Sequence, residues 1–410
     1  MTSDMRSATY DGVRHWPPDP PRPAPVREFL MAAFLRAAVR DLPIRVALPG
    51  GKVLGSGDSN SPVMRIIRPA ALYRRLGVCG PIGFGEGYLA GDWSSTDPAA
   101  VLTPFAARLR RPASRTAALA RRVLDQARPA AERNTPEGAR ANIHRHYELS
   151  NDMFALFLDE SMTYSSAIFA PGDDLHAAQL RKIDAILDGA GVRSGSTLIE
   201  IGTGWGALAI RAARRGAEVT TVTNSQAQAD LARSRIADAG LSDRVTVRLG
   251  DYREASGTYD AVVSVEMIEA VGAEFWPVYF ETLSRLAVPG GRVALQAITM
   301  PHDRMLATRD VYTWTQKYVF PGGQALSMRA IEEQAAQAGL RIDARRSIGA
   351  HYARTLHEWR ERFLAAREQC AALGFDEAFE RMWEYYLAYS EAGFRSGYLE
   401  CWQIQLGKTA

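Results

Sequence analysis

The residues best placed to do chemistry lie where an apolar run of strand length, Leu198–Ile201, ends in a glycine-rich turn. The turn carries Gly202, Gly204 and Gly206, and a helical pattern follows directly. Glycines let the backbone approach a ligand closely, and the N–H groups at the start of a helix point towards it. Glu200, at the end of the strand, can accept a hydrogen bond from a hydroxyl or ammonium group of that ligand. The spacing Glu-x-Gly-x-Gly-x-Gly is not the dinucleotide-binding pattern Gly-x-Gly-x-x-Gly.

This spacing resembles the first motif of S-adenosylmethionine (SAM) methyltransferases, and the next two strands end in groups that SAM needs. Most relatives of this fold place an acid against the ribose hydroxyls at the end of the second strand. Here the polar groups are neutral, and we predict that Asn224 and Gln228, beside Thr223, replace that acid. The third strand ends at Asp251 and Tyr252, where a carboxylate can accept from the adenine amino group and an aromatic ring can cover the adenine.

The elements that must position these residues alternate regularly along the chain. The apolar patterns predict strands at 197–201, 218–222, 245–249, 259–265 and 291–297, and helices at 174–190, 208–215 and 226–239. Strands that alternate with helices indicate an α/β fold with a parallel, doubly wound sheet. We therefore expect a Rossmann-like class I SAM methyltransferase whose ligands bind at the carboxyl ends of the strands.

A smaller domain is expected before this one. Residues 1–24 are predicted to be a disordered leader because they are rich in proline. Residues 25–128 are predicted to form an α+β lipid- or membrane-binding domain, 129–141 a linker and 142–410 the methyltransferase domain. Within the smaller domain we expect a helix at 26–41, strands near 44–48 and 63–67, a short helix at 70–76, a glycine-rich corner at 83–93 and a basic, largely helical stretch at 102–128.

Composition narrows the function classes. No apolar run approaches the roughly 20 residues that a membrane span needs, and the N-terminus has no apolar core of a signal peptide. The three cysteines, Cys79, Cys370 and Cys401, lie far apart without metal-ligand spacing, so we predict neither a disulfide framework nor a metal site. A reducing cytoplasm is the plain inference.

Charge is distributed unevenly along the chain. Residues 1–141 contain 21 Lys and Arg against 12 Asp and Glu, whereas the remainder contains 28 against 34. A basic N-terminal third suggests an anionic partner, and an anionic phospholipid membrane surface fits. Nucleic acid is not expected, because no zinc-finger or RNA-binding signature is present. An ordinary solvated basic surface is the alternative. We expect a cytoplasmic protein that lies peripherally on the inner face of the cell membrane.

Several motifs together resemble the cyclopropane-fatty-acid synthase family, whose SAM-dependent members act on unsaturated acyl chains. The resemblance covers residues 142–407 and implies that Tyr164 and Ser165 also line the SAM pocket. It also implies a homodimer. The matching stretches are Tyr147-Glu-Leu-Ser-Asn-Asp, Met162-Thr-Tyr-Ser-Ser-Ala, Ile201-Gly-Thr-Gly-Trp-Gly, Gly250-Asp-Tyr-Arg, Val265-Glu-Met-Ile-Glu-Ala-Val-Gly, Lys317-Tyr-Val-Phe-Pro-Gly-Gly, His351-Tyr352, Ala392-Gly-Phe-Arg395 and Trp402-Gln403. The segment Gly85-Glu-Gly-Tyr is similar to the N-terminal lipid-binding domain of full-length bacterial members.

Methyl transfer to an alkene leaves a carbocation, so the site must also remove a proton. The family resemblance implies a bound bicarbonate as the base, held by a Cys, a Glu, a His and a Tyr. Glu269 and Tyr352 match two of these positions, whereas the Cys position is Ser166 and the His position is Gln296. Serine and glutamine can still hydrogen-bond an anion. Alternatively, a carboxylate such as Glu269 or Glu266 takes the proton itself.

Aromatic faces can stabilise the carbocation through cation–π attraction. Core packing is the alternative role for most of the aromatic residues in this part of the chain. The candidates are Tyr312, Trp314, Tyr318, Phe320 and Trp276.

The product depends on the sequence of steps after methyl transfer. A displaced base acting after a hydride shift would give an exocyclic methylene group, whereas direct ring closure would give a cyclopropane. The run from Gln296 to Asp310 resembles the actinobacterial branch that makes 10-methyl-branched fatty acids, in which a separate flavin-dependent reductase saturates the methylene. We therefore predict a 10-methylene product from an oleoyl-type phospholipid chain. A cyclopropane on the same substrate, a small-molecule N-methyltransferase and a non-catalytic lipid-binding protein are the alternatives.

Overall fold

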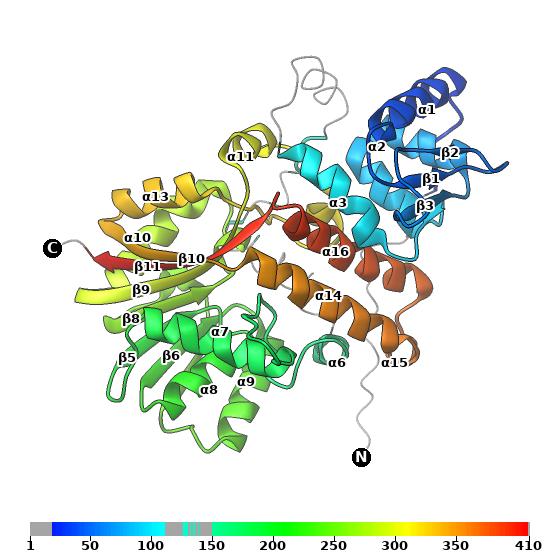
Figure 1. Ribbon diagram of the computed structural model, residues 1–410. Helices are drawn as coiled ribbons and strands as arrows, with labels where there is room; N and C mark the ends of the chain where they lie inside the picture. Colours follow the sequence, from blue (N-terminus) through cyan, green and yellow to red (C-terminus); the bar gives the residue numbers. More distant parts are fainter. Residues whose placement is uncertain are drawn as a thin grey trace.

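The computed structural model describes residues 19–110, 126–129, 132, 134, 135, 138 and 150–408. A seven-stranded sheet with the order β10-β11-β9-β8-β5-β6-β7 organises its larger part (Figure 1). Neighbouring strands from β9 to β7 are parallel, and β11 runs antiparallel to both of its neighbours. The strands are β5 (Thr197–Ile201), β6 (Glu218–Thr223), β7 (Val245–Leu249), β8 (Tyr259–Val265), β9 (Ala287–Thr299), β10 (Leu340–Ser347) and β11 (Glu400–Lys408). The predicted α/β class is confirmed, with one antiparallel strand added to the expected parallel sheet.

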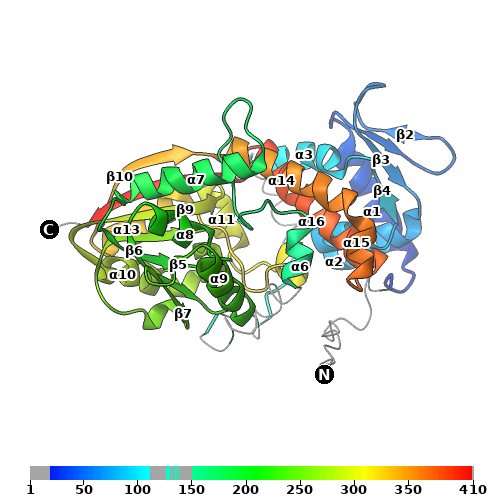
Figure 2. The ribbon, with the colours of Figure 1, turned by 90° about the horizontal axis from the view of Figure 1, so that it is seen from below.

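Helices cover both faces of this sheet, as the alternating pattern predicts (Figures 1 and 2). One face carries α7 (Leu175–Gly189), α8 (Ala207–Arg214) and α9 (Gln226–Asp238), and the other carries α10 (Trp276–Leu286) and α13 (Met328–Gln337). Each face has its own apolar core. Because β5 is covered on both sides, four of its five residues are buried, and three of these four are apolar.

The N-terminal part combines helices with a small sheet of order β2-β1-β3-β4. Its elements are α1 (Pro25–Val39), β1 (Arg45–Ala47), β2 (Val53–Leu54), β3 (Val63–Ile66), α2 (Pro69–Leu89), β4 (Trp93–Ser94) and α3 (Pro98–Leu109). The glycine-rich stretch predicted as a corner is instead the second half of α2, which kinks at Gly80 before Pro81. Glycine is needed there for close packing, since a Cβ at Gly85 would lie 2.4 Å from the Trp314 ring.

Two long helices near the C-terminus join the N-terminal part to the sheet. They are α14 (Gly349–Ala365) and α16 (Glu377–Arg395), with α15 (Arg367–Ala372) between them. α16 packs against both α2 and α3, and residues of all these helices share one apolar core (Figure 2). Polar contacts also join α2 to the segment before α13, because Glu86 of α2 accepts hydrogen bonds from Lys317 Nζ at 2.6 Å and from the Tyr318 hydroxyl at 2.8 Å.

Shorter helices complete the described chain. They are α6 (Asn151–Ala155), α11 (His302–Thr308), α12 (Trp314–Tyr318) and the 3-10 turns η2 (Tyr252–Glu254), η3 (Ile268–Ala270) and η4 (Ala273–Phe275). Among the helices described, none combines the length and apolar character required to cross a membrane. Most of the predicted leader, most of the predicted linker and residues 111–125 of the predicted basic stretch lie outside the described residues.

Candidate active site

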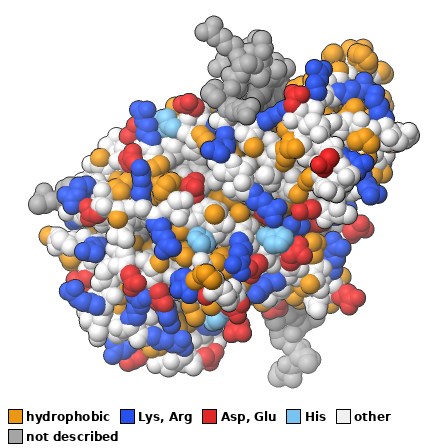
Figure 3. Space-filling view, viewed as in Figure 1, with side chains coloured by type: hydrophobic (Ala, Val, Ile, Leu, Met, Phe, Trp, Pro, Cys, Tyr) orange, Lys and Arg blue, Asp and Glu red, His pale blue; other side chains and the backbone are white. Residues whose placement is uncertain are grey.

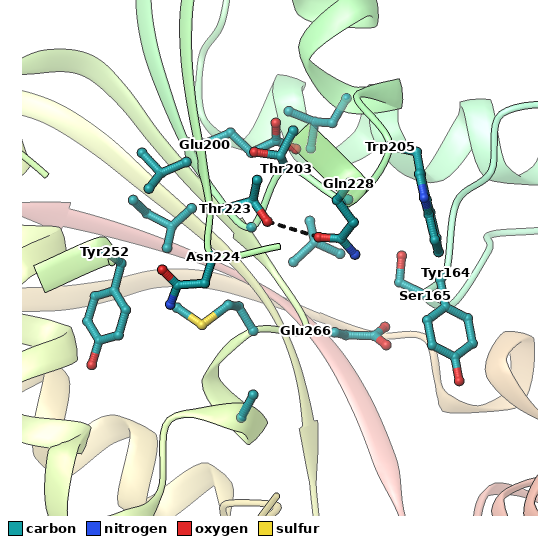
Figure 4. A pocket seen from close by; sticks show the side chains of 18 of the residues that line it. Tyr164, Ser165, Glu200, Thr203, Trp205, Thr223, Asn224, Gln228, Tyr252 and Glu266 are labelled. Atoms are coloured by element: carbon teal, nitrogen blue, oxygen red, sulfur yellow. Dashed lines mark hydrogen bonds between the residues drawn. The ribbon is translucent and has the colours of Figure 1, made fainter. Parts of the chain in front are cut away.

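One cavity lies at the carboxyl ends of β5, β6 and β8, where a ligand of this fold is expected (Figure 4). Of the eleven predicted cofactor residues, ten line it. They are Tyr164, Ser165, Glu200, Gly202, Gly204, Thr223, Asn224, Gln228, Asp251 and Tyr252. Gly206 instead begins α8, where its positive φ of 88° forms the N-cap and a Cβ would lie 3.3 Å from that of Ala232.

The glycine turn after β5 lines the cavity, and its glycines have no side chains that would fill it. Gly202 and Gly204 have φ values of 99° and 52°, in the left-handed region that favours glycine. A Cβ at Gly204 would meet no atom of the described residues within 4 Å, so it would occupy space that the cavity leaves for a ligand. This is the close backbone approach predicted from the glycine spacing.

Glu200 is buried at the end of β5. Its Oε2 accepts a hydrogen bond from the Thr221 hydroxyl at 2.6 Å. Burial raises the pKa of Glu200 to about 8, against the lowering effects of this hydrogen bond and of the nearby Lys182 charge. A cationic group entering the cavity would restore the charged form, which suits the ammonium group of an amino acid.

Beyond Glu200, the cavity wall holds polar atoms that lack a partner in the part of the chain that the structure describes. Thr223 donates to Gln228 Oε1 at 2.9 Å, which fixes the Gln228 amide at the cavity (Figure 4). Asn224 Oδ1 and the Tyr252 hydroxyl are buried, and neither has a hydrogen-bond partner among the described residues. Because buried polar atoms are normally paired, these two atoms indicate a ligand that supplies the missing bonds.

Asp251 remains a hydrogen-bond acceptor at the same wall. Burial would raise its pKa, but hydrogen bonds from Arg253, including Nη2 to Oδ2 at 2.7 Å, hold the pKa below its usual value. An ionised carboxylate beside the Tyr252 ring can accept from the exocyclic amino group of an adenine, as predicted.

A second group of contacts surrounds Glu266, which follows β8 and also lines the cavity. Its Oε1 accepts from the Ser166 backbone N–H at 3.0 Å, from Gln296 Nε2 at 2.7 Å and from Cys401 Sγ at 3.7 Å. Its Oε2 accepts from the Tyr352 hydroxyl at 2.6 Å. We call these four donors, from Ser166, Gln296, Cys401 and Tyr352, the anion cage.

Three of the four predicted catalytic residues thus contribute a donor to one carboxylate. Ser166 does so through its backbone, because its hydroxyl donates to the Ala167 carbonyl at 3.0 Å. Glu269 lies next to the cage, where its Oε1 accepts from the Ile298 backbone N–H. Burial, followed by the negative charge of Glu266, raises the pKa of Glu269 to about 8.

Lys182, in α7, is a charged residue of the cavity that the sequence analysis missed. Its side chain is almost fully buried, lines the cavity and donates to the Ser165 hydroxyl at 2.7 Å. Burial lowers the pKa of Lys182 to about 8, while the charges of Glu266, Asp159 and Glu200 oppose this shift. A lone lysine in an amphipathic helix gives no sequence signal, so only the fold reveals its role.

The aromatic residues proposed for stabilising a carbocation are placed mainly in cores. Trp314 and Tyr318 pack in the core shared with α2 and α16, and Trp276 packs beneath the sheet. Tyr312 donates to Glu132. Closer to the cavity, the Tyr164 hydroxyl lies 2.8 Å from that of Tyr386, and a Phe320–Tyr386 ring contact continues from it.

The sheet order and the cavity at its carboxyl edge define a Rossmann-like, SAM-dependent methyltransferase. Solved structures support this class. The cyclopropane synthase MmaA2 from Mycobacterium tuberculosis matches with a TM-score of 0.62 and 31% identity, over 66% of this chain and 98% of that one. The mycolic acid cyclopropane synthase CmaA1, in complex with SAH and CTAB, matches with a TM-score of 0.61 and 30% identity, over 68% of this chain and 99% of that one.

The chain belongs to the mycolic acid cyclopropane synthetase family, whose model matches residues 134–404. It is 50% identical to the tuberculostearic acid methyltransferase UfaA1 of Mycobacterium tuberculosis, over 99% of this chain and 98% of that protein. It is also 32% identical to the cyclopropane-fatty-acyl-phospholipid synthase of Escherichia coli, over 85% of this chain and 88% of that protein. The predicted family and the SAM cofactor are therefore confirmed.

Proposed function

We propose that this enzyme methylates the double bond of an oleoyl-type chain in a phospholipid and leaves a 10-methylene branch. The observation that carries the proposal is the 50% identity, over 99% of the chain, to a relative named for methylation towards tuberculostearic acid. A cyclopropane product on the same substrate is the second candidate, because the family model and the Escherichia coli relative are named for it.

The residues of the cavity fit SAM group by group. The turn at Gly202 and Gly204 leaves room for the methionine portion, and Glu200 suits its ammonium group. Asn224 Oδ1 and the Tyr252 hydroxyl need partners that the ribose and adenine would supply. When bound, SAM supplies an electrophilic methyl group. Tyr164, whose ring lines the cavity, presents an aromatic group that can stabilise the carbocation formed on the acyl chain.

A membrane surface is the partner that the N-terminal part suits best. Helix α1 exposes large apolar side chains, with Phe29 71% exposed and Phe34 54% exposed, beside Val26 and Leu30 (Figure 3). The exposed Arg27, Arg36 and Arg40 lie in or next to the same helix. An amphipathic helix with apolar side chains and flanking cations binds anionic bilayers through both. We therefore propose that α1 rests on the cytoplasmic face of the cell membrane.

Vesicle sedimentation tests this docking. Replacing Phe29 and Phe34 by Ser should weaken binding to phosphatidylglycerol vesicles, and the control Leu306→Ser should not. Leu306 is also 54% exposed, but it lies on α11. Equal vesicle binding by both variants would contradict the proposal that α1 binds the membrane.

Incubation with labelled SAM and oleoyl-phospholipid vesicles tests the proposed reaction. Mass and NMR analysis of the lipids should reveal a methylene branch, and its amount should equal the amount of SAH released. A product with a ring alone would establish the second candidate. Methylation of soluble amines without vesicles would favour the small-molecule N-methyltransferase, and SAM binding without SAH release would favour the non-catalytic lipid-binding protein. The flavin-dependent reductase and the homodimer stay predictions.

A further inference from the structure

The anion cage is already filled by a side chain of the protein. Both oxygens of Glu266 accept hydrogen bonds within it, from Gln296 Nε2 at 2.7 Å on one side and from the Tyr352 hydroxyl at 2.6 Å on the other. The Ser166 N–H and the Cys401 thiol add further donors to Oε1. Glu266 therefore takes the place at which a small carboxylate-like anion would bind.

Bicarbonate, implied by the family resemblance, does not fit this arrangement. Two of the positions implied by the resemblance are unchanged in this chain, Glu269 and Tyr352. Tyr352, in the anion cage, already donates to Glu266. Glu269, next to the cage, accepts from the Ile298 N–H through Oε1, and its buried Oε2 has no hydrogen-bond partner among the described residues. A free anion would have to displace Glu266 from its bonds and lie beside its charge, which costs electrostatic energy in a buried site.

The groups around the Glu266 carboxylate are hydrogen-bond donors, neutral side chains and a cation. The pKa of Glu269 is raised to about 8 by burial and by the charge of Glu266, so Glu269 is mainly neutral at pH 7. Burial and the Glu266 charge also raise the pKa of Tyr352 and of Cys401 well above their usual values, so both remain neutral donors. Lys182 is the cation whose charge interacts with Glu266.

Backbone geometry and position agree with a functional role for Glu266. Its φ of 50° is in the left-handed region, which among the described non-glycine residues only Ser150 and Met162 share. Such strain costs about 1–3 kcal/mol and persists where the surroundings over-determine it, often at active sites. The strained turn aims the carboxylate away from β8 towards Ser165 and Tyr164 (Figure 4).

We propose that the Glu266 carboxylate is the proton acceptor of this enzyme and that no bound bicarbonate is needed. The inference rests on the proposed function. Methyl transfer leaves a carbocation on the acyl chain. After a hydride moves with its electron pair to the cationic carbon, a C–H bond of the transferred methyl group breaks, and its electron pair forms the exocyclic C=C bond. The proton goes to Glu266 Oε2, which gives a neutral lipid and a neutral carboxyl group. Without the hydride shift, the same pair closes a cyclopropane, and the acceptor is unchanged.

Turnover with and without bicarbonate tests the proposal. SAH release from oleoyl-phospholipid vesicles is measured in buffer freed of carbon dioxide and again with added millimolar bicarbonate. The wild-type rate should be the same in both. Glu266→Gln keeps the shape of the side chain but removes the basic carboxylate, and it should lower the rate by about 10²–10⁴-fold with an unchanged SAM Kd. Glu281→Gln, at an exposed position of α10, is the surface control.

Glu266→Gly sharpens the test, because it relieves the strained backbone and empties the cage. Added bicarbonate or formate should restore part of its activity and none of that of Glu266→Gln, whose side chain still fills the cage. A wild-type rate that depends on bicarbonate would overturn the proposal while leaving the proposed function in place. So would full activity of Glu266→Gln. A wild type that releases no SAH under either condition would instead contradict the proposed function.

Discussion

The cofactor side of the cavity, at the ends of β5, β6 and β7, leaves buried polar atoms unpaired, whereas the cage side, around Glu266, satisfies its donors with a carboxylate of the protein. Asn224 Oδ1 and the Tyr252 hydroxyl have no partner among the described residues. The Gln296 amide and the Tyr352 hydroxyl both donate to Glu266. Unpaired buried groups predict a ligand, and paired ones predict that none is required. The donors of the anion cage are therefore already paired, unlike the polar atoms of the cofactor side, and Glu269 Oε2 is the buried atom beside the cage that has no partner among the described residues.

The largest effect is expected when a side chain is introduced at Gly204, where the cofactor side of the cavity is open, because it should weaken SAM binding. In Gly204→Val a branched side chain would enter the cavity from a backbone with φ of 52°. We expect the SAM Kd to rise by about 100-fold or more, equivalent to about 3 kcal/mol. Calorimetric titration measures it. The control Gly195→Val has a similar φ of 79° and open space, but lies in the turn before β5. An equal loss of SAM affinity in both variants would point to strain alone.

The next effect concerns Glu200, whose carboxylate we propose to pair with the ammonium group of SAM. Because the pKa of Glu200 is about 8 in the free protein, pairing with a cation below that pH must expel a proton. SAM affinity should rise as the pH increases towards about 8, and the proton release is measured by calorimetry in buffers of different ionisation enthalpy. Glu200→Gln should weaken binding roughly 10- to 100-fold, as expected for a hydrogen bond to a charged group, and remove the proton release. A wild-type SAM affinity that does not change with pH would contradict this role of Glu200. Lys182, whose charge interacts with that of Glu200, is the neighbouring group whose pKa is also about 8.

A smaller effect is expected at Glu269 on the cage side. Above a pH of about 8 this residue ionises and places a second negative charge beside Glu266. We expect wild-type turnover to fall above that pH as Glu269 loses its proton, and the fall to be absent in Glu269→Gln. At pH 7 this variant should lose about tenfold or less, well below the loss in Glu266→Gln. The pH profile of kcat measures both, and a larger loss in Glu269→Gln would make Glu269 the acceptor.

The smallest effect is expected at Thr223, which lines the cavity and orients Gln228. Thr223 holds the Gln228 amide through one hydrogen bond of 2.9 Å. Thr223→Val removes it at nearly constant volume and should cost about 1 kcal/mol, which corresponds to roughly a fivefold weaker SAM Kd. kcat at saturating SAM should not change. A lower kcat would show that Gln228 also affects the cage side.

Much of the cofactor side could be predicted from the sequence because its residues follow local patterns. The strands predicted at 197–201, 245–249 and 259–265 have those bounds in the structure, and a turn after each strand supplies the lining residues. Parallel strands bring their carboxyl ends to one edge without any further information. Periodicity and turn chemistry were sufficient for these residues, whereas Tyr164 and Ser165 were expected only from the family resemblance.

The cage side could be predicted only in part, because its members come from distant elements. Cys401 lies on β11, an antiparallel strand that the alternating pattern did not predict, and Lys182 lies on the buried face of α7. Glu266 was considered as an alternative base, but its left-handed backbone and its place inside the cage depend on tertiary contacts. Similarly, the glycines of α2 signal a turn locally, whereas the ring of Trp314 requires them for helix packing.

The core that joins α2, α3 and α16 has a consequence for how the enzyme could be shortened or regulated. The hydroxyl of Tyr386, on α16, lies 2.8 Å from the hydroxyl of Tyr164 at the cavity wall. The helix that packs against the N-terminal part therefore also supports the cavity. Cutting away residues before α3 would expose an apolar flank of α16 and loosen that wall. The N-terminal part and the part that contains the seven-stranded sheet should therefore unfold in a single cooperative thermal transition. Membrane binding through α1, as proposed above, would then also rigidify the cavity wall.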